Sequence, residues 1–340
     1  MLGSEAWPHE APPPPLAGFS FSPLSSQWAH RDPVVDLSLL LAATNPDLVR
    51  LPIYWETVEP SPDRLDFSSV DALLEAVVLH NERASNQTRV VLTIGARNFL
   101  YPELHEPAWA GPRQQPHLNQ MQSGRAYRSY IDSSILRYRG SPLLYAWQVE
   151  NEPFDYVVND LTGDDQIQPA QLAWEIDEVH RLDPGRQAMT TTFDGWNVAI
   201  DTFQLFAEPL ESWLGVPLSG HPADALAAGD VLGLDLYVDG PSVPLRFTSP
   251  ALRSEWKAQA IEFWAAQAAA QKKQLWLAEV QAAPWGTALH GFTPADLIAS
   301  AAGYRRQPVQ VVLMWGADTW LQDPAWLSAG AQAMAILRAQ

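Results

Sequence analysis

The chain has 340 residues, no cysteine and a formal charge of −18 from 39 acidic and 21 basic residues. The lack of cysteine excludes disulfides, thiolate catalysis and cysteine-ligated metals, and the acidic balance argues against nucleic acid or an anionic membrane surface as a partner. No apolar run approaches the roughly 20 residues that span a bilayer, so we expect no membrane insertion, and the N-terminus lacks the basic and apolar regions of a signal peptide.

Alternating strands and helices are expected to follow a Pro-rich lead-in of residues 1–16. The clearest helix start is Asp32-Pro33, where Asp32 suits the N-cap and Pro33 the first helical position. The strand-like apolar runs cover residues 17–21, 48–54, 89–94, 143–149, 187–193, 231–237, 274–280 and 309–315. The expected helices cover residues 33–43, 68–78, 125–138, 169–182, 200–211, 249–270, 294–304 and 324–337.

Eight such runs, each followed by a helix at a spacing of about 40 residues, predict parallel strands joined by right-handed crossovers. We therefore expect one (β/α)8 TIM barrel over residues 17–340, with long loops after the strands. The competing architecture is a doubly wound open sheet. That fold often carries a Gly-rich phosphate loop after its first strand, and this chain has none there.

Two glutamates stand at the ends of apolar runs. Glu152 follows the fourth run in Asn151-Glu152-Pro153, and Glu279 closes Leu-Trp-Leu-Ala-Glu in the seventh. The carboxyl ends of barrel strands carry catalytic groups. Glycosidic bond cleavage needs one carboxyl group as acid and a second as nucleophile or base, with environments that separate their pKa values. Glu150 is the alternative acid, since it lies on the same side as Glu152 in an extended strand.

Arg50 lies inside the second apolar run and needs a carboxylate partner. Two readings stay open: a structural ion pair within the barrel, or a cation that holds a catalytic carboxylate ionised.

This set resembles the clan A glycoside hydrolases, the retaining (β/α)8 enzymes that include the cellulase-like family 5. Those enzymes carry Asn-Glu-Pro with an acid/base Glu after strand four and a nucleophile Glu at strand seven. They commonly have an Arg on strand two, a Tyr after strand six and a Trp after strand eight. The matching positions are Asn151-Glu152-Pro153, Glu279, Arg50, Tyr237 and Trp315, within a resemblance over about residues 17–330. The chain departs from family 5 at Asp235-Leu236-Tyr237, where His-x-Tyr is frequent.

The resemblance implies a retaining glycoside hydrolase that cleaves β-glycosidic bonds of a polysaccharide or oligosaccharide, as cellulases and mannanases do. It implies Glu152 as acid/base, Glu279 as nucleophile, and carboxyl groups about 5–5.5 Å apart. The alternatives are a barrel that binds carbohydrate without cleaving it and an exo-acting β-glycosidase. An isomerase or aldolase usually needs a phosphate site, a metal or a Schiff-base lysine, and the lysines here are few and lie in or beside expected helices.

Further residues are expected to contact the sugar. The residues expected to bind substrate are Arg50, Asn151, Tyr237, Trp315, Trp55, Trp285, Trp109 and Asn98. For each Trp in this set other than Trp315, packing within the protein is an equally good explanation.

No metal or cofactor is expected, because the eight histidines show no ligand spacing. We expect a monomer. Export to the medium or cell surface is favoured if an export segment has been removed.

Overall fold

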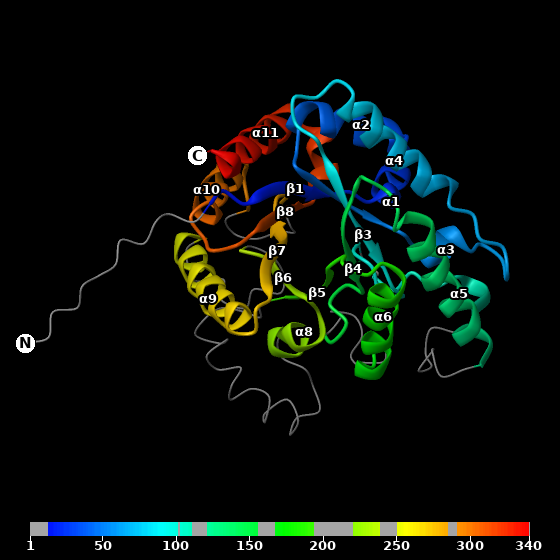
Figure 1. Ribbon diagram of the computed structural model, residues 1–340. Helices are drawn as coiled ribbons and strands as arrows, with labels where there is room; N and C mark the ends of the chain where they lie inside the picture. The colour runs from blue at the N-terminus through cyan, green and yellow to red at the C-terminus, as the bar shows by residue number, and fades with distance from the viewer. Residues whose placement is uncertain are drawn as a thin grey trace, which may run out of the picture.

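Eight parallel strands form one closed barrel (Figure 1), as the sequence predicts. The computed structural model describes residues 13–100, 103–110, 121–155, 167–193, 220–238, 250–284 and 291–339. Each strand is hydrogen-bonded to the next in chain order, and β8 pairs with β1 to close the ring. The strands are β1 (Leu16–Ser20), β2 (Leu48–Pro52), β3 (Arg89–Ile94), β4 (Leu144–Val149), β5 (Ala188–Phe193), β6 (Val231–Leu236), β7 (Gln274–Gln281) and β8 (Val311–Trp315).

Helices surround the barrel, and the last helix, α11, packs against β1 and α2 so that the ring closes (Figure 1). The larger helices are α2 (Pro33–Thr44), α4 (Ser68–Asn81), α5 (Met121–Tyr138), α6 (Pro169–Leu182), α9 (Pro250–Ala270), α10 (Pro294–Tyr304) and α11 (Pro324–Arg338). Shorter ones are α1 (Pro23–Trp28), α3 (Trp55–Val58), α8 (Pro222–Ala228), and the 3-10 turns η1 (Ala108–Ala110) and η3 (Ala317–Gln322).

The predicted elements differ from the observed ones mainly at their ends. Asp32 is the N-cap of α2 as expected, and its carboxylate accepts from the backbone of Val34 and Val35. Helix α5 begins at Met121 rather than Arg125. The helices α1, α3 and α8 were not predicted, because so few residues show no apolar periodicity. The predicted helix over 200–211 lies outside the described residues.

The barrel interior changes from apolar to polar along the strands. An apolar cluster contributed by many strands fills the interior on the side of the amino ends of the strands. It comprises Leu48, Val91, Ala146, Met189, Val231, Trp276, Ala278, Val311 and Leu313. Side chains two positions later on a strand point to the same side. Those positions carry Arg50, Thr93, Gln148 and Thr191, all buried. Polar groups therefore gather at the carboxyl ends of the strands, above an apolar floor.

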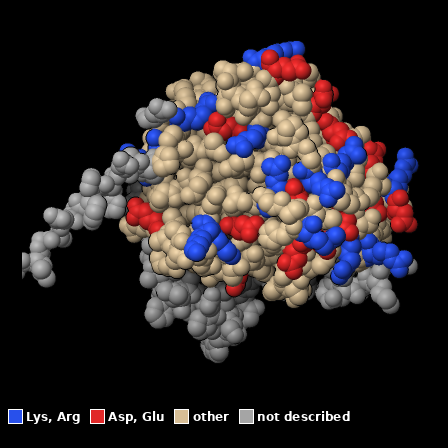
Figure 2. Space-filling view, viewed as in Figure 1, with Lys and Arg blue, Asp and Glu red and all other residues tan. Residues whose placement is uncertain are grey.

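The larger apolar cluster lies between the barrel and its helices and includes Phe19, Leu92, Trp147, Leu277 and Val312. On the outer face seen in Figure 2, acidic and basic side chains are interspersed rather than separated by sign. Of the helices described, none combines the length and apolar character that crossing a bilayer requires.

Candidate active site

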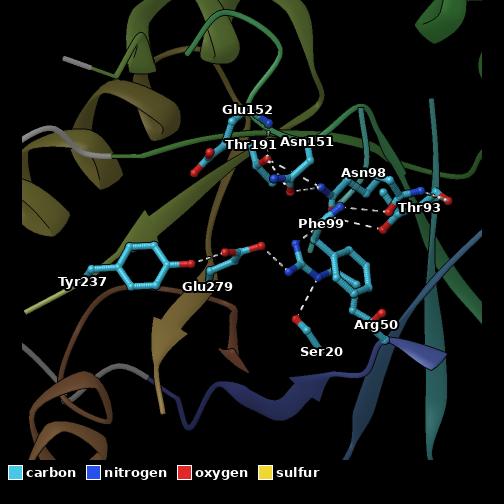
Figure 3. Close-up of polar contacts among 12 residues, drawn as sticks. Ser20, Arg50, Thr93, Asn98, Phe99, Asn151, Glu152, Thr191, Tyr237 and Glu279 are labelled. Atoms are coloured by element: carbon cyan, nitrogen blue, oxygen red, sulfur yellow. Dashed lines mark hydrogen bonds and ion pairs between the residues drawn. The ribbon is translucent and has the colours of Figure 1, made fainter. Parts of the chain in front are cut away.

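Arg50 is fully buried, and each of its side-chain nitrogens has an acceptor (Figure 3). Its Nε donates to Ser20 Oγ at 2.8 Å, and its Nη1 donates to Gln148 Oε1 at 2.9 Å. Its Nη2 donates to the Glu279 carboxylate and forms an ion pair with it. The ring of Phe99 lies under the guanidinium at 4.2 Å. The carboxylate that the sequence requires for Arg50 is therefore the candidate nucleophile.

Glu279 receives a second hydrogen bond, from the hydroxyl of Tyr237 (Figure 3). The register between β6 and β7 shifts just before Asp235, which pairs with Glu279 across the two strands. Burial raises the pKa of Glu279 above its usual value, and the charge of Arg50 and the hydrogen bond from Tyr237 oppose this increase. A guanidinium and a phenol at hydrogen-bond distance stabilise the ionised form of this carboxyl group.

Glu152 lies just beyond the end of β4 and is only half-buried. Its backbone is left-handed, with φ of 46°, and its N–H donates to Thr191 Oγ1 on β5 at 2.9 Å. Burial raises the pKa of Glu152 well above its usual range, and the charges of Glu103, Asp155 and Glu279 add to the increase. The charge of Arg97 acts in the opposite direction and lowers the pKa. This environment favours a protonated carboxyl group, the opposite of what Arg50 does to Glu279.

A buried chain of hydrogen bonds connects the two glutamates. Gln148 accepts from Arg50, and its Nε2 donates to Asn151 Oδ1 at 3.0 Å. Asn151 immediately precedes Glu152 and also accepts from Thr191 at 3.4 Å. Gln148 and Thr191 were not predicted from the sequence as site residues. The available signal for Gln148 was a lone amide inside the apolar run of β4.

Glu150 does not share the side of Glu152, which corrects the expectation from an extended strand. Both residues have positive φ, 60° and 46°, so the alternation of a strand does not apply to them. Glu150 is fully buried and accepts from the backbone N–H of Ala96 at 3.0 Å and of Arg97 at 2.6 Å. It holds the turn that follows β3 and lies away from solvent.

The residues expected around the sugar fall into different environments. Trp315 is half-exposed, and its ring meets that of Tyr237 edge-on at 6.1 Å. Asn98 is buried, donates to Thr93 O at 3.1 Å and accepts from the N–H of Phe99 at 3.0 Å. Its side chain therefore serves the turn after β3.

Trp55 is fully buried, stacks on Tyr130 at 5.9 Å and donates from Nε1 to Glu59 at 2.7 Å. No face of that ring is free for a sugar, so the expectation that Trp55 binds substrate is corrected: it is a packing residue. Trp109 is half-buried, packs edge-on against Trp55 at 5.8 Å and donates to the Glu59 carbonyl. Trp285 lies outside the described residues.

Asp235 is a third carboxyl group at this site. It is fully buried on β6, and neither of its oxygens has a hydrogen-bond donor among the described residues. Burial raises its pKa well above the usual range, and the charges of Glu279 and Glu152 raise it further. In the sequence it was noted only as a departure from His-x-Tyr. An acidic residue inside the apolar run of β6 was the signal that could have marked it.

No protein-family model and no curated protein sequence matches the chain. Solved structures do. GH5_18 from Streptomyces cattleya in complex with GlcNAc has 18% identity and a TM-score of 0.67, with 97% of this chain and 82% of that chain covered. A GH5_18 variant from Bifidobacterium longum subsp. longum with Manb1-4GlcNAc has 15% identity and a TM-score of 0.63, covering 94% and 78%.

Xylanase 10B from Thermotoga petrophila with xylobiose has 15% identity and a TM-score of 0.53, covering 89% of this chain and 82% of that chain. The likeness establishes the fold. It is a (β/α)8 barrel of the kind found in these glycoside hydrolases, as the resemblance in the sequence implied.

Proposed function

We propose that this protein is a retaining glycoside hydrolase that cleaves β-glycosidic bonds of an oligosaccharide or polysaccharide. Glu279 is the nucleophile and Glu152 the acid/base. The observation that carries the proposal is the contrast between the two glutamates. Glu279 is paired with Arg50 and Tyr237, which favours its ionised form, whereas the surroundings of Glu152 favour its protonated form. Opposite environments of this kind separate an acid from a nucleophile.

In the first step a Glu279 oxygen bonds to the anomeric carbon while the bond from that carbon to the leaving oxygen breaks. Glu152 gives its proton to the leaving oxygen. In the second step Glu152 takes a proton from water, the water oxygen bonds to the anomeric carbon, and Glu279 leaves as a carboxylate. Tyr237 and Arg50 stabilise Glu279 when its charge returns, and Trp315 offers an apolar ring beside Tyr237.

The sugar itself is proposed only by analogy with the similar structures. Two of them are described with Manb1-4GlcNAc and one with xylobiose. These sugars support mannosides and xylosides in a first panel, with Manβ1-4GlcNAc as one natural disaccharide, and galactosides and glucosides complete the panel.

The test is intact-mass analysis after incubation with activated 2-fluoro glycosides of that panel. Wild type, Glu279→Ala and Glu152→Ala are compared, with Glu75→Ala as a control because Glu75 is exposed on α4. We expect a stable adduct on the wild type and the control and none on Glu279→Ala. An adduct that persists in Glu279→Ala would refute Glu279 as nucleophile.

The acid role has its own test. Glu152→Ala should lose about 10²–10⁴-fold in kcat/KM on a glycoside with a poor leaving group. It should form the adduct readily from a dinitrophenyl glycoside, whose departure needs no proton. Azide should then speed turnover and yield a glycosyl azide of retained configuration. An inverted azide product would contradict the double displacement.

Two alternatives stay testable. A barrel that only binds carbohydrate would retain an oligosaccharide in calorimetry, yet release no sugar and form no adduct. An exo-acting β-glycosidase would release single sugars from chain ends, whereas an internal cleavage produces a spread of oligosaccharides. Product analysis on a soluble polysaccharide separates these cases.

A further inference from the structure

The ring of Phe99, in the turn that follows β3, covers one face of the Arg50 guanidinium (Figure 3). The Cζ atom of Arg50 lies 4.2 Å from the centroid of this ring, and both side chains are buried. A cation over an aromatic face is attracted by the ring quadrupole, and the attraction grows when water is excluded. The faces of a guanidinium are weakly hydrated and therefore stack well on aromatic rings.

The hydrogen bonds of Arg50 and its contact with Phe99 restrict different motions. The N–H groups of a guanidinium lie in its plane. The bonds to Ser20, Gln148 and Glu279 therefore fix the position of the group within that plane. A tilt out of the plane bends these bonds without breaking them. The Phe99 ring stands on one face and blocks a tilt to that side, so it supplies a constraint that the hydrogen bonds lack.

Phe99 is itself held in place through its main chain. Its N–H donates to Asn98 Oδ1 at 3.0 Å, and its carbonyl oxygen accepts from the Tyr54 hydroxyl at 2.8 Å. Asn98 in turn donates to Thr93 O at 3.1 Å, and the Tyr54 hydroxyl lies 2.8 Å from Ser22 Oγ. The side chain of Asn98, which was expected to bind sugar, thus helps to fix the ring beside Arg50.

We propose that Phe99 is a positioning residue, whose contact with the Arg50 guanidinium holds that group on the Glu279 carboxylate. The contact itself rests on the geometry, whereas its consequence for catalysis rests on the proposed function. In that function Glu279 loses its charge when it bonds to the sugar and regains it when it leaves. A guanidinium that stays in place through both steps needs no reorganisation as the charge returns.

The first test measures how often the Arg50 side chain leaves its partners. Proton NMR of the full chain with nitrogen-15 arginine gives the exchange rate of the Arg50 Nε–H, which donates to Ser20 Oγ at 2.8 Å. Exchange of a buried N–H with solvent requires local opening, so the rate reports how firmly the guanidinium is held. Spectra of Arg50→Lys assign the signal by its absence.

The decisive variant carries trifluorophenylalanine in place of Phe99, fluorinated at the three ring carbons farthest from the backbone. This ring keeps nearly the same shape but has little negative charge on its face, so the attraction for a cation is lost. The exchange rate of the Arg50 Nε–H should rise about 2–30-fold, the factor to which such a contact corresponds. A residue that only fills space would leave the rate unchanged.

The matched control places the same fluorinated residue at position 67. The Phe67 ring also lies beneath an arginine, Arg137, at 5.4 Å. That arginine is 47% exposed and pairs with Asp71, so the contact lies at the surface. The control should leave the Arg50 exchange rate unmoved. Thermal melting confirms that each variant is folded.

Phe99→Leu extends the test to catalysis. If glycosides are hydrolysed, kcat/KM should fall about 2–30-fold. The acid limb of its pH profile should move to higher pH, because Arg50 then favours ionised Glu279 less. Phe67→Leu should leave that limb in place. The other titratable groups that act on Glu279 are unchanged in both variants, and they are Tyr237, Glu103, Glu152 and Asp235.

An Arg50 exchange rate that stays the same with the fluorinated ring at position 99 overturns the inference, even if the enzyme hydrolyses glycosides. A lower kcat/KM in Phe99→Leu with an unmoved acid limb also contradicts it, since Phe99 would then act only in packing. A faster exchange in a protein that cleaves no glycoside supports the contact of Phe99 with Arg50 while the proposed function fails.

Discussion

Arg50 and Glu279 form an ion pair inside the barrel although 229 positions separate them in the chain. The pair connects β2 to β7 across the polar layer, and its members are 0% and 4% exposed. Such a pair forms only when the barrel closes. The position of the Glu279 carboxylate and its charge therefore both depend on Arg50.

Arg50→Ala should destabilise the protein by about 3–5 kcal/mol, because it leaves a buried carboxylate without its counterion. Arg137→Ala is the control. Arg137 pairs with Asp71 at the surface, where both side chains are more than one third exposed, and its loss should cost about 1 kcal/mol or less. Urea unfolding at pH 7 measures both. Equal losses would mean that the buried pair contributes no more than the surface pair.

Tyr237→Phe should lower kcat/KM roughly 10–150-fold, since a hydrogen bond to a charged group is worth about 1.5–3 kcal/mol. The fold should be unaffected. Tyr145→Phe serves as the control, because Tyr145 stacks on Trp276 at 5.5 Å near the apolar floor. The rates of glycoside hydrolysis are compared under identical conditions. Equal rates for Tyr237→Phe and the wild type would show that Glu279 does not depend on the phenol.

A second pair of carboxyl groups should make the protein less stable at pH 8 than at pH 5. The single hydroxyl of Tyr127 lies 2.9 Å from Glu150 and 2.6 Å from Glu175, so it can donate to only one of them. Burial raises the pKa of Glu150 to about 7 and that of Glu175 well above its usual range. Both are protonated when folded at pH 5, and the stability this gives is lost as pH rises through the folded pKa values.

Glu175→Gln should reduce that loss by about 2 kcal/mol or more, since each pH unit between the folded and unfolded pKa is worth about 1.4 kcal/mol. Glutamine can fill the position, because one oxygen of Glu175 has no hydrogen-bond partner in the described structure. The control is Glu75→Gln, an exposed site on α4. Urea midpoints at both pH values give the result. An unchanged pH dependence in Glu175→Gln would refute the attribution of the stability loss to ionisation of Glu175.

Gly95→Ala should destabilise the protein by about 2 kcal/mol or more. Gly95 has φ of +131°, and a Cβ there would lie 2.5 Å from the Glu150 carboxyl group. Gly140→Ala is the matched control, since a Cβ at Gly140 meets nothing within 4 Å, and its effect should be within about 1 kcal/mol. Melting temperatures of the two variants decide the matter. A harmless Gly95→Ala would show that the turn after β3 can move away from Glu150.

The strands were predictable because a barrel strand is buried on both faces and reads as an apolar run. The same reading located Arg50 and Glu279, whose charges interrupt such runs. Glu150 was misplaced because sequence alone does not reveal the left-handed backbone at Glu150 and Glu152. Trp55 was misassigned for a related reason: a strand-end aromatic packs inward or outward according to neighbours such as Tyr130, which lies 75 positions later in the chain.

Asp235 could be seen in the sequence but not interpreted there. The role of Asp235 depends on strand register, because the pairing of β6 with β7 places it opposite Glu279. Gln148 was overlooked likewise, because its importance lies in bridging Arg50 and Asn151 rather than in its own type.

The alignment of Asp235 with Glu279 by main-chain pairing has a consequence for how this protein can change. Hydrogen bonds of the sheet fix the positions of the strand residues Asp235 and Glu279, whereas Trp109 belongs to the segment that follows β3. Loops from another barrel could therefore replace the segments after the strands while Asp235 and Glu279 keep their spacing. Under the proposed function, we expect loop replacement to change the choice of sugar while the residues proposed for bond cleavage stay in place.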